Sequence, residues 1–403
     1  MNCIDNMTES ESSYEDVTSQ SSDEDISQTE NLNLNSNIIN NYNIIYELGR
    51  GSYSIVWLAY NINNFKFYAL KVQNPNEYKE GINEITFVKK LPKTPNIFNN
   101  IINSFIEIVD DKKYLCSVWN LHAFNIDYLI RKTEYKISID NIKCIMKQLI
   151  TAIDILHNKF KVYHGDIKTD NILIKGLNGK DEYFINEYNK EYIKEYNKEI
   201  DNFYVTNKIK LSNLNKKKIR LEIHSKITEN IIDKINNHES PLENINFLEK
   251  IECSLADFGT YCDEDTYYDE SFGTRYYQAP EIILMGKCSY PVDIWALGCT
   301  FYELLTGEVL FDPNKDSNYS RDYYHLCLIN ETCGNFTNNF LEKTKHYKDF
   351  FDSESNIINH VNKLNEKLDN FDPEYSKLLK DMLVIDPNKR ITIQELKKTN
   401  YFN

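Results

Sequence analysis

One short segment constrains this chain more than any other, because it places three different polar groups between apolar flanks. It runs from Tyr163 to Leu173 and reads Y-H-G-D-I-K-T-D-N-I-L. A carboxylate (Asp166), an ammonium (Lys168) and an amide (Asn171) follow one another closely within it. A D-x-K-x-x-N pattern is common by chance, so its meaning depends on the motifs that accompany it.

Phosphoryl transfer requires these three kinds of group. A carboxylate orients the attacking hydroxyl and accepts its proton, a cation lies near the transferring phosphate, and an oxygen ligand holds Mg²⁺. Asp166, Lys168 and Asn171 match those needs in that order. The sequence predicts that Asp166 and Lys168 are catalytic and that Asn171 binds metal.

A glycine-containing turn lies upstream, in residues 47–56. The residues E-L-G-R-G-S-Y-S-I-V predict a strand, a tight turn and a second strand. Gly49 and Gly51 would let backbone amides approach nucleotide phosphates closely. Ser54 stands where a third glycine is usual, so an ordinary hairpin turn is the alternative interpretation.

A lysine within strand-like sequence follows the glycine turn. Lys71 lies in the run at residues 65–72, where its side chain could simply extend to solvent. Its distance from the glycine turn is instead typical of the lysine that binds the α- and β-phosphates. Glu84 opens a helical pattern in which Ile85 and Val88 face inward. Glu84 is the candidate ion-pair partner of Lys71, and a solvated helix glutamate is the alternative.

Further motifs follow in order downstream. L-A-D-F-G at residues 255–259 supplies a second metal carboxylate, Asp257. G-T-R-Y-Y-Q-A-P-E at 273–281, D-I-W-A-L-G at 293–298 and D-P-N-K-R at 386–390 come after it. For Glu281, Asp293 and Arg390 in these last three motifs we expect structural roles rather than chemical ones.

Together these motifs resemble those of eukaryotic-type protein kinases, over about residues 42 to 402. The resemblance implies an α+β, bilobal fold, with an N-lobe of antiparallel sheet plus one helix at 42–121 and a mainly helical C-lobe at 122–403. A long insertion, 176–252, precedes the D-F-G motif. ATP would bind between the lobes, with Mg²⁺. By the same resemblance Glu281 and Arg390 would form a buried ion pair, and Asp293 would hold the backbone of the catalytic loop.

The resemblance also assigns a nucleotide pocket. The hinge between the lobes is expected at residues 119–122, with Trp119 as a bulky gatekeeper behind the adenine. Val56, Ala69 and Leu173 would enclose the ring. The expected ATP-binding residues are Leu48, Gly49, Gly51, Ser54, Val56, Ala69, Lys71, Glu84, Asn120, Leu121 and Leu173, and the metal ligands are Asn171 and Asp257.

Within this family the chain is most similar to the SR-protein kinases. Its glycine turn reads G-x-G-x-x-S-x-V-W, and residues 310–329 and 347–351 resemble their C-lobe segments. The likeness implies phosphorylation of serines beside arginines, in a basic strand held by an acidic groove. Two positions depart from the pattern, since Tyr324 replaces an acid and Gln278 replaces an arginine. The expected substrate-contacting residues are Thr274, Arg275, Arg321 and Glu331.

Gly165 stands where protein kinases in general carry an arginine, and by resemblance the SR-protein kinases also lack that arginine. That arginine reads a phosphate in the activation segment and orders the segment. Without this arginine, a phosphate group on Thr266, Tyr267, Tyr268 or Ser271 has no cationic partner at this position. The sequence therefore predicts an enzyme that is active without activation-loop phosphorylation.

Composition sets the remaining expectations. The net charge of −15 and the pI of about 5.1 are compatible with a basic protein substrate rather than direct binding of nucleic acid. No apolar run is long enough to span a membrane, and the nine cysteines show no C-x-x-C pair. We expect a cytoplasmic monomer, with a nuclear pool if the basic run at 216–220 acts as a signal. Residues 1–41 read as a disordered acidic tail.

Two alternatives remain at the level of function. A pseudokinase scaffold would bind partners without catalysis, but its usual mark is loss of the catalytic Asp, the metal Asp or the strand Lys, and this chain keeps all three. The second alternative is an active kinase of the same group with a different substrate preference.

Overall fold

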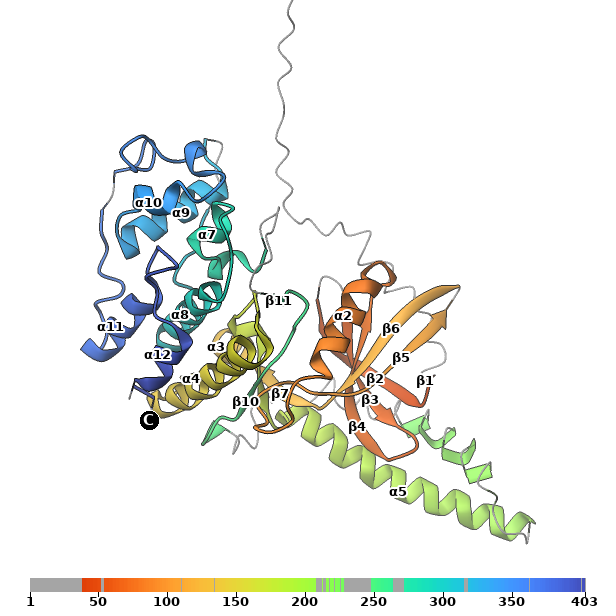
Figure 1. Cartoon of the computed structure of the whole chain (residues 1–403). Coiled ribbons are helices and arrows are strands. Elements are labelled where there is room, and N and C mark those ends of the chain that lie inside the picture. Colours follow the sequence, from red (N-terminus) through yellow and green to blue (C-terminus); the bar gives the residue numbers. More distant parts are fainter. Residues whose placement is uncertain are drawn as a thin grey trace, which may run out of the picture.

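An antiparallel sheet forms the N-terminal lobe (Figure 1). In the computed structural model its strands lie in the order β1 (Ile38–Ile39), β2 (Tyr42–Arg50), β3 (Ser54–Asn61), β4 (Lys66–Gln73), β6 (Lys112–Trp119) and β5 (Ile101–Val109). Helix α2 (Tyr78–Val88) follows the short turn η1 (Pro75–Glu77) and packs against β5 and β6. The predicted sheet plus one helix is confirmed.

The sheet begins earlier than the sequence analysis expected. The structure describes residues 38–51, 54–109, 111–133, 135–207, 248–263, 272–314, 318–361, 363–399 and 401–402, with scattered residues between 212 and 227. The predicted disordered tail reached residue 41, but Ile38 and Ile39 pair with Asn43 and Tyr42. Ile39 and Tyr42 are buried, and burial of this apolar surface stabilises the added strand. The remainder of the predicted tail lies outside the described residues.

The sheet is apolar on both faces. Side chains alternate along β3, so Trp57 and Ala59 pack into one core with Leu70, while Leu58 and Tyr60 point to the opposite face. A half-solvated sheet would carry polar residues on that second face. A further layer must therefore cover it.

The insertion before the D-F-G motif supplies that layer. Helix α5 (Gly179–Asn207) lies along the sheet in Figure 1. Its aromatic residues recur every four positions and so share one helix face. The ring of Tyr188 lies 5.1 Å from that of Tyr60 and 5.2 Å from that of Phe67. The apolar cluster joins Phe184, Tyr188, Tyr192, Ile223 and Ile227 to Leu58 and Tyr60. We expected the insertion as part of the C-lobe, but this portion packs on the N-lobe.

The C-terminal lobe is mainly helical, as predicted. Its helices are α3 (Ile126–Arg131), α4 (Ile139–Asp154) with its π-helical extension η2 (Ile155–Phe160), α7 (Pro280–Ile283), α8 (Pro291–Thr306), α9 (Arg321–Cys333), α10 (Asn338–Leu341), α11 (Pro373–Met382) and α12 (Ile393–Lys398). The short turns are η3 (Thr169–Asn171), η5 (Arg275–Tyr277) and η6 (Tyr347–Asp349). Two small sheets, β10–β9–β7 and β11–β8, consist of β7 (His122–Asn125), β8 (Val162–Tyr163), β9 (Ile172–Lys175), β10 (Cys253–Leu255) and β11 (Cys262–Asp263).

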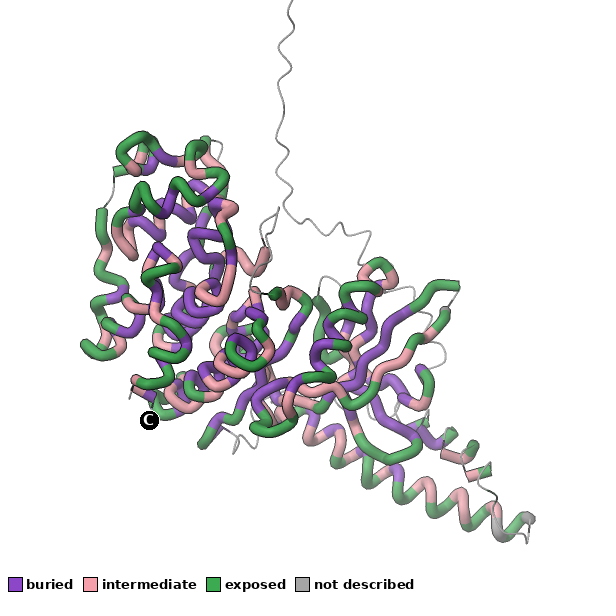
Figure 2. The backbone as a smooth tube through the Cα atoms, viewed as in Figure 1, coloured by how far each residue is buried: buried purple, intermediate pink, exposed green. Residues whose placement is uncertain are grey.

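Helix α8 is the centre of the C-lobe. Its residues 292–304 are all buried, and α4 and α11 pack against it (Figure 2). A helix that is apolar on every side is stable only when it is enclosed by its neighbours. It therefore provides a fixed floor on which the loops of the site can be anchored.

A buried ion pair connects α7 to the segment before α12 in this lobe. The Arg390 guanidinium donates to both carboxylate oxygens of Glu281, at 2.7 and 3.0 Å. Its remaining donors reach the carbonyls of Pro291, Val384 and Ile385. The predicted pair of Glu281 and Arg390 is confirmed.

Among the described residues, no helix has the length and apolar character needed to cross a membrane.

Replacing Arg390 by methionine tests the structural role of the buried pair. The variant strands the Glu281 carboxylate, so we expect the free energy of unfolding to fall by about 3–5 kcal/mol. Urea denaturation of the protein measures this change. The matched control is Lys389→Met, because Lys389 is mostly exposed and lies 3.9 Å from Asp386; it should change stability by less than about 0.5 kcal/mol. Equal stabilities of Arg390→Met and the unmodified protein would contradict the assignment.

Candidate active site

A cavity of about 430 Å³ lies between the glycine turn, the hinge and the D-F-G segment. β2 and β3 form its roof, and Leu173 of β9 lies on its floor. Trp119, the predicted gatekeeper, also lines it and donates from its indole N–H to Ser117 Oγ at 2.8 Å. The structure brings these predicted residues to the cavity: Leu48, Gly49, Gly51, Ser54, Val56, Ala69, Lys71, Glu84, Asn120, Leu173, Asn171 and Asp257.

Leu121 is the expected nucleotide residue that does not line this cavity. Its side chain packs against the aromatic cluster on α5. Neighbouring side chains of an extended hinge point to opposite sides, so Asn120 and Leu121 face different surroundings. Leu121 therefore packs toward α5 rather than into the cavity.

An ion pair connects β4 to α2 at the inner end of the cavity. Lys71 Nζ lies 3.0 Å from Glu84 Oε2, and Glu84 is buried. Burial alone would lower the pKa of Lys71, but attraction to Glu84 and Asp257 outweighs it, so the pKa is raised. Lys71 is thus a fixed cation that faces the metal carboxylate.

The catalytic-loop groups converge around the Asp166 carboxylate. Its Oδ1 accepts the backbone N–H of Thr274 at 2.8 Å, and its Oδ2 lies 2.8 Å from Lys168 Nζ. Asn171 Nδ2 donates to the Asp166 carbonyl at 2.8 Å. Burial raises the pKa of Asp166, but the charge and hydrogen bond of Lys168 and the hydrogen bond from Thr274 lower it by more, so the net pKa falls. The group is therefore ionised at neutral pH and can accept a hydrogen bond from a substrate hydroxyl.

Helix α8 holds this loop through one buried carboxylate. Asp293 accepts the backbone N–H groups of His164 and Gly165 at 2.8 and 2.9 Å. It also accepts a hydrogen bond from His157 Nε2 at 2.8 Å. Burial raises the pKa of Asp293, but the hydrogen bonds from His157 and Gly165 and the imidazoles of His157 and His164 lower it by more. The net pKa of Asp293 is therefore lowered. The expected role of Asp293 is confirmed.

The D-F-G segment is held in an inward arrangement. Phe258 is buried against the rings of Phe87, Phe98 and His164. The preceding residue, Asp257, has a positive φ of 62°, an uncommon backbone conformation for a non-glycine residue. With Phe258 packed in this way, Asp257 lines the same cavity as Lys71.

Asn171 and Asp257 suit a Mg²⁺ ion. Because the Asn171 amide nitrogen donates to Asp166, its oxygen remains as the acceptor for a cation. Magnesium in such sites is held by one or two protein oxygens together with substrate phosphates and water. Consistently, the described part of the chain contains no cluster of three or more His, Cys, Asp or Glu that could hold a metal alone.

The predicted substrate residues lie in separate parts of the C-lobe. Thr274 accepts a hydrogen bond from Lys168 Nζ and belongs to the catalytic loop surroundings. Arg275 forms an ion pair with Asp322. Arg321 begins α9 and is exposed, whereas Glu331 near its other end pairs with His360 at 3.6 Å. Ten residues of helix separate Arg321 from Glu331 by about 15 Å.

Sequence reasoning missed a second buried carboxylate of α8. Glu303 accepts hydrogen bonds from the Tyr277 hydroxyl at 2.5 Å and from Thr169 Oγ1 at 3.2 Å, and it also contacts Arg131. It thereby connects the catalytic loop to η5. The signal was available, since Glu303 is the second acid in an otherwise apolar helical run.

Asn178 and Asp181, at the start of the insertion, were also missed. Both line the cavity. Nothing in the low-complexity sequence around them distinguishes Asp181 from its many acidic neighbours.

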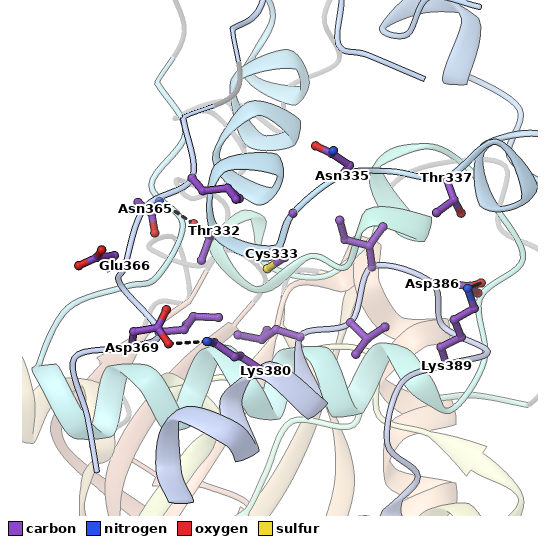
Figure 3. Close-up of a pocket in the computed structure, with 16 residues that line it drawn as sticks. Thr332, Cys333, Asn335, Thr337, Asn365, Glu366, Asp369, Lys380, Asp386 and Lys389 are labelled. Carbon is purple, nitrogen blue, oxygen red and sulfur yellow. Dashed lines mark hydrogen bonds and ion pairs between the residues drawn. The ribbon is translucent and has the colours of Figure 1, made fainter. Parts of the chain in front are cut away.

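A larger cavity of about 600 Å³ lies elsewhere in the C-lobe, between α9, α11 and the 383–389 segment (Figure 3). Its charged side chains largely pair with each other, since Asp369 contacts Lys380 and Asp386 lies near Lys389. No predicted catalytic residue lines it.

The protein kinase domain family matches residues 42–186 and 241–402 of this chain. A protein of Acanthamoeba polyphaga mimivirus, named as a serine/threonine-protein kinase (L205), is 26% identical over 98% of this chain and 94% of its own length. The serine/threonine-protein kinase SRPK of Physarum polycephalum is 28% identical, over 88% of this chain and 84% of its own. Protein kinase dsk1 of Schizosaccharomyces pombe is 24% identical, over 87% of this chain and 78% of its own length. The chain belongs to the protein kinase family, as a eukaryotic-type serine/threonine-protein kinase that resembles the SR-protein kinases.

Proposed function

We propose that this kinase transfers the γ-phosphoryl group of ATP to serine hydroxyls in arginine-rich protein segments, and that it needs no phosphorylation of its activation segment. The observation that carries the proposal is the assembled catalytic loop, in which Lys168 and the Thr274 amide both engage Asp166. Lys71 is paired with Glu84 at the same time.

In the proposed mechanism Asp166 orients the serine hydroxyl and takes its proton. Lys168 lies beside Asp166 and offsets negative charge on the transferring group. Lys71, positioned by Glu84, binds the α- and β-phosphates. Asn171 and Asp257 would hold Mg²⁺, which neutralises charge on the phosphate oxygens when bound.

Two local features support activity without a phosphorylated activation segment. Gly165 has a φ of 81°, and a Cβ there would meet the Thr260 carbonyl oxygen at 2.9 Å, so this backbone excludes the usual arginine. Gln278 donates from its side-chain amide to the carbonyls of Phe272 and Gly273. An internal hydrogen bond thus holds the end of the segment. Thr266, Tyr267, Tyr268 and Ser271 lie outside the described residues.

The preference for basic substrates rests on the resemblance to SR-protein kinases and on the net charge of −15. An uncharged Gln278 and an Arg275 already paired with Asp322 favour a second candidate, a kinase that does not require a phosphoserine or acid beside the target. The two candidates differ in the residues that flank the phosphorylated serine.

The variant Asp166→Asn tests the role of the carboxylate. It should lower kcat by roughly 10² to 10⁴-fold, because the amide cannot accept the hydroxyl proton. Steady-state assay of ATP turnover on a protein substrate measures the loss. Asp369→Asn, which changes an exposed acid of the C-lobe, is the control and should retain full kcat. A kcat of Asp166→Asn equal to that of the unmodified enzyme would remove Asp166 from the mechanism.

Phosphatase treatment tests independence from activation. Protein produced without upstream kinases, and then dephosphorylated, should keep its rate within about twofold, because Gln278 rather than a phosphate holds the end of the segment at Phe272 and Gly273. The control is mock-treated protein, with mass spectrometry to verify removal of phosphate. A drop of tenfold or more after treatment would contradict the proposal.

A peptide array that varies the residues beside a central serine tests specificity. We expect kcat/KM to fall by about tenfold when arginines next to the serine become alanine, because a protein with a net charge of −15 favours a basic strand. Peptides in which more distant arginines are changed serve as controls. Indifference to neighbouring arginines would contradict the arginine preference, and indifference to a neighbouring acid would support the second candidate.

A further inference from the structure

One wall of the nucleotide cavity comes from the insertion rather than from the two lobes. Asn178 and Asp181, at the start of α5, line the cavity together with Leu48 and Ala123. The Asp181 side chain is almost wholly buried, with the residue 2% exposed. Burial of an ionised carboxylate is costly unless hydrogen bonds compensate it. The mechanism above gives Asp181 no role.

Two side chains donate hydrogen bonds to the Asp181 carboxylate. The Tyr46 hydroxyl, from β2 of the N-lobe, donates to Oδ1 at 2.5 Å. Asn178 Nδ2 donates to Oδ2 at 2.8 Å and also to the carbonyl of Ala123, after the hinge, at 3.0 Å. Burial raises the pKa of Asp181 above its usual value, and the hydrogen bonds from Tyr46 and Asn178 offset only part of that rise.

The carboxylate retains capacity for another hydrogen bond. An ionised carboxylate offers about four acceptor positions, and each Asp181 oxygen has one protein donor. The residue lines the cavity, so a bound molecule could supply a further donor. A site that leaves a buried acceptor short of donors discriminates strongly in favour of ligands that carry one.

The contacts of Asp181 place it at the hinge end of the cavity. β2 runs from Tyr46 through Leu48 to the glycine turn at Gly49 and Gly51. Lys71 and Asp257 lie at the phosphate end, whereas Asp181 contacts Tyr46 and, through Asn178, the hinge. At that end a nucleotide presents its nucleoside, whose hydrogen-bond donors are the ribose hydroxyls and the amino group of the base.

We propose that Asp181 accepts a hydrogen bond from the nucleoside part of ATP, so that the insertion completes the nucleotide pocket. The inference rests on ATP as the phosphoryl donor. A ribose hydroxyl and the adenine amine share the same chemistry toward a carboxylate, and the experiment distinguishes them.

The test compares KM values of Asp181→Asn and the unmodified enzyme for four nucleotides. These are ATP, 2′-deoxy-ATP, 3′-deoxy-ATP and purine riboside triphosphate, which lacks the amino group. We expect KM for ATP to rise about 10-fold with kcat within about twofold, because a hydrogen bond to a charged acceptor is lost. For the analogue that lacks the donor bound by Asp181, the variant Asp181→Asn and the unmodified enzyme should have the same KM. The exposed residue Asp201, on the same helix, provides the control variant Asp201→Asn.

A KM for ATP that changes less than about twofold would overturn the inference. An equal rise for all four nucleotides would also overturn it, because a purely structural role affects them alike. Should Asp181→Asn fail to fold, Tyr46→Phe removes only the hydroxyl that orients the carboxylate. For that variant we expect the KM for ATP to rise about threefold and the KM for the analogue that lacks the bound donor to stay unchanged. An equal rise in KM for all four nucleotides would contradict the inference. If the unmodified enzyme shows no turnover with ATP, the proposed function itself fails.

Discussion

The buried carboxylate of Asp293 is the contact on which the rest of the site depends. It accepts two consecutive backbone amides of the catalytic loop, at His164 and Gly165. It comes from α8, which neighbouring helices enclose. The loop is therefore anchored to the most deeply buried element of the C-lobe. Asp166 follows directly, and its position relative to Lys168 and Thr274 depends on that anchor.

The upper half of the site is fixed in a different way. Lys71 is held by Glu84 on α2, and Phe258 packs on Phe87 of the same helix. A single helix thus sets both the phosphate-binding lysine and the segment that carries Asp257. The insertion stabilises this lobe from the other face, because α5 covers the apolar side of the sheet at Leu58 and Tyr60.

Most of the site was predictable because its chemistry depends on residue types at fixed spacing. Asp166, Lys168, Asn171 and Asp257 meet where the motifs placed them. The insertion was not predictable in this way. Its repeated tyrosines are buried only because Leu58 and Tyr60 present a second apolar face, and that complementarity arises in three dimensions. Leu121 and Asp181 were misjudged or missed for the same reason, since both owe their surroundings to α5. Nor did the sequence indicate the ion pair between Arg275 and Asp322, which lie 47 residues apart in the chain.

The central claim is that segments distant in the sequence converge on one triphosphate and its metal ions. A crystal structure of the protein with Mg²⁺ and a non-hydrolysable ATP analogue tests it most directly. The account predicts Lys71 at the α- and β-phosphates, metal coordinated by Asn171 and Asp257, and the γ-phosphate facing Asp166. A nucleotide bound outside this cavity, or metal held by other side chains, would contradict it.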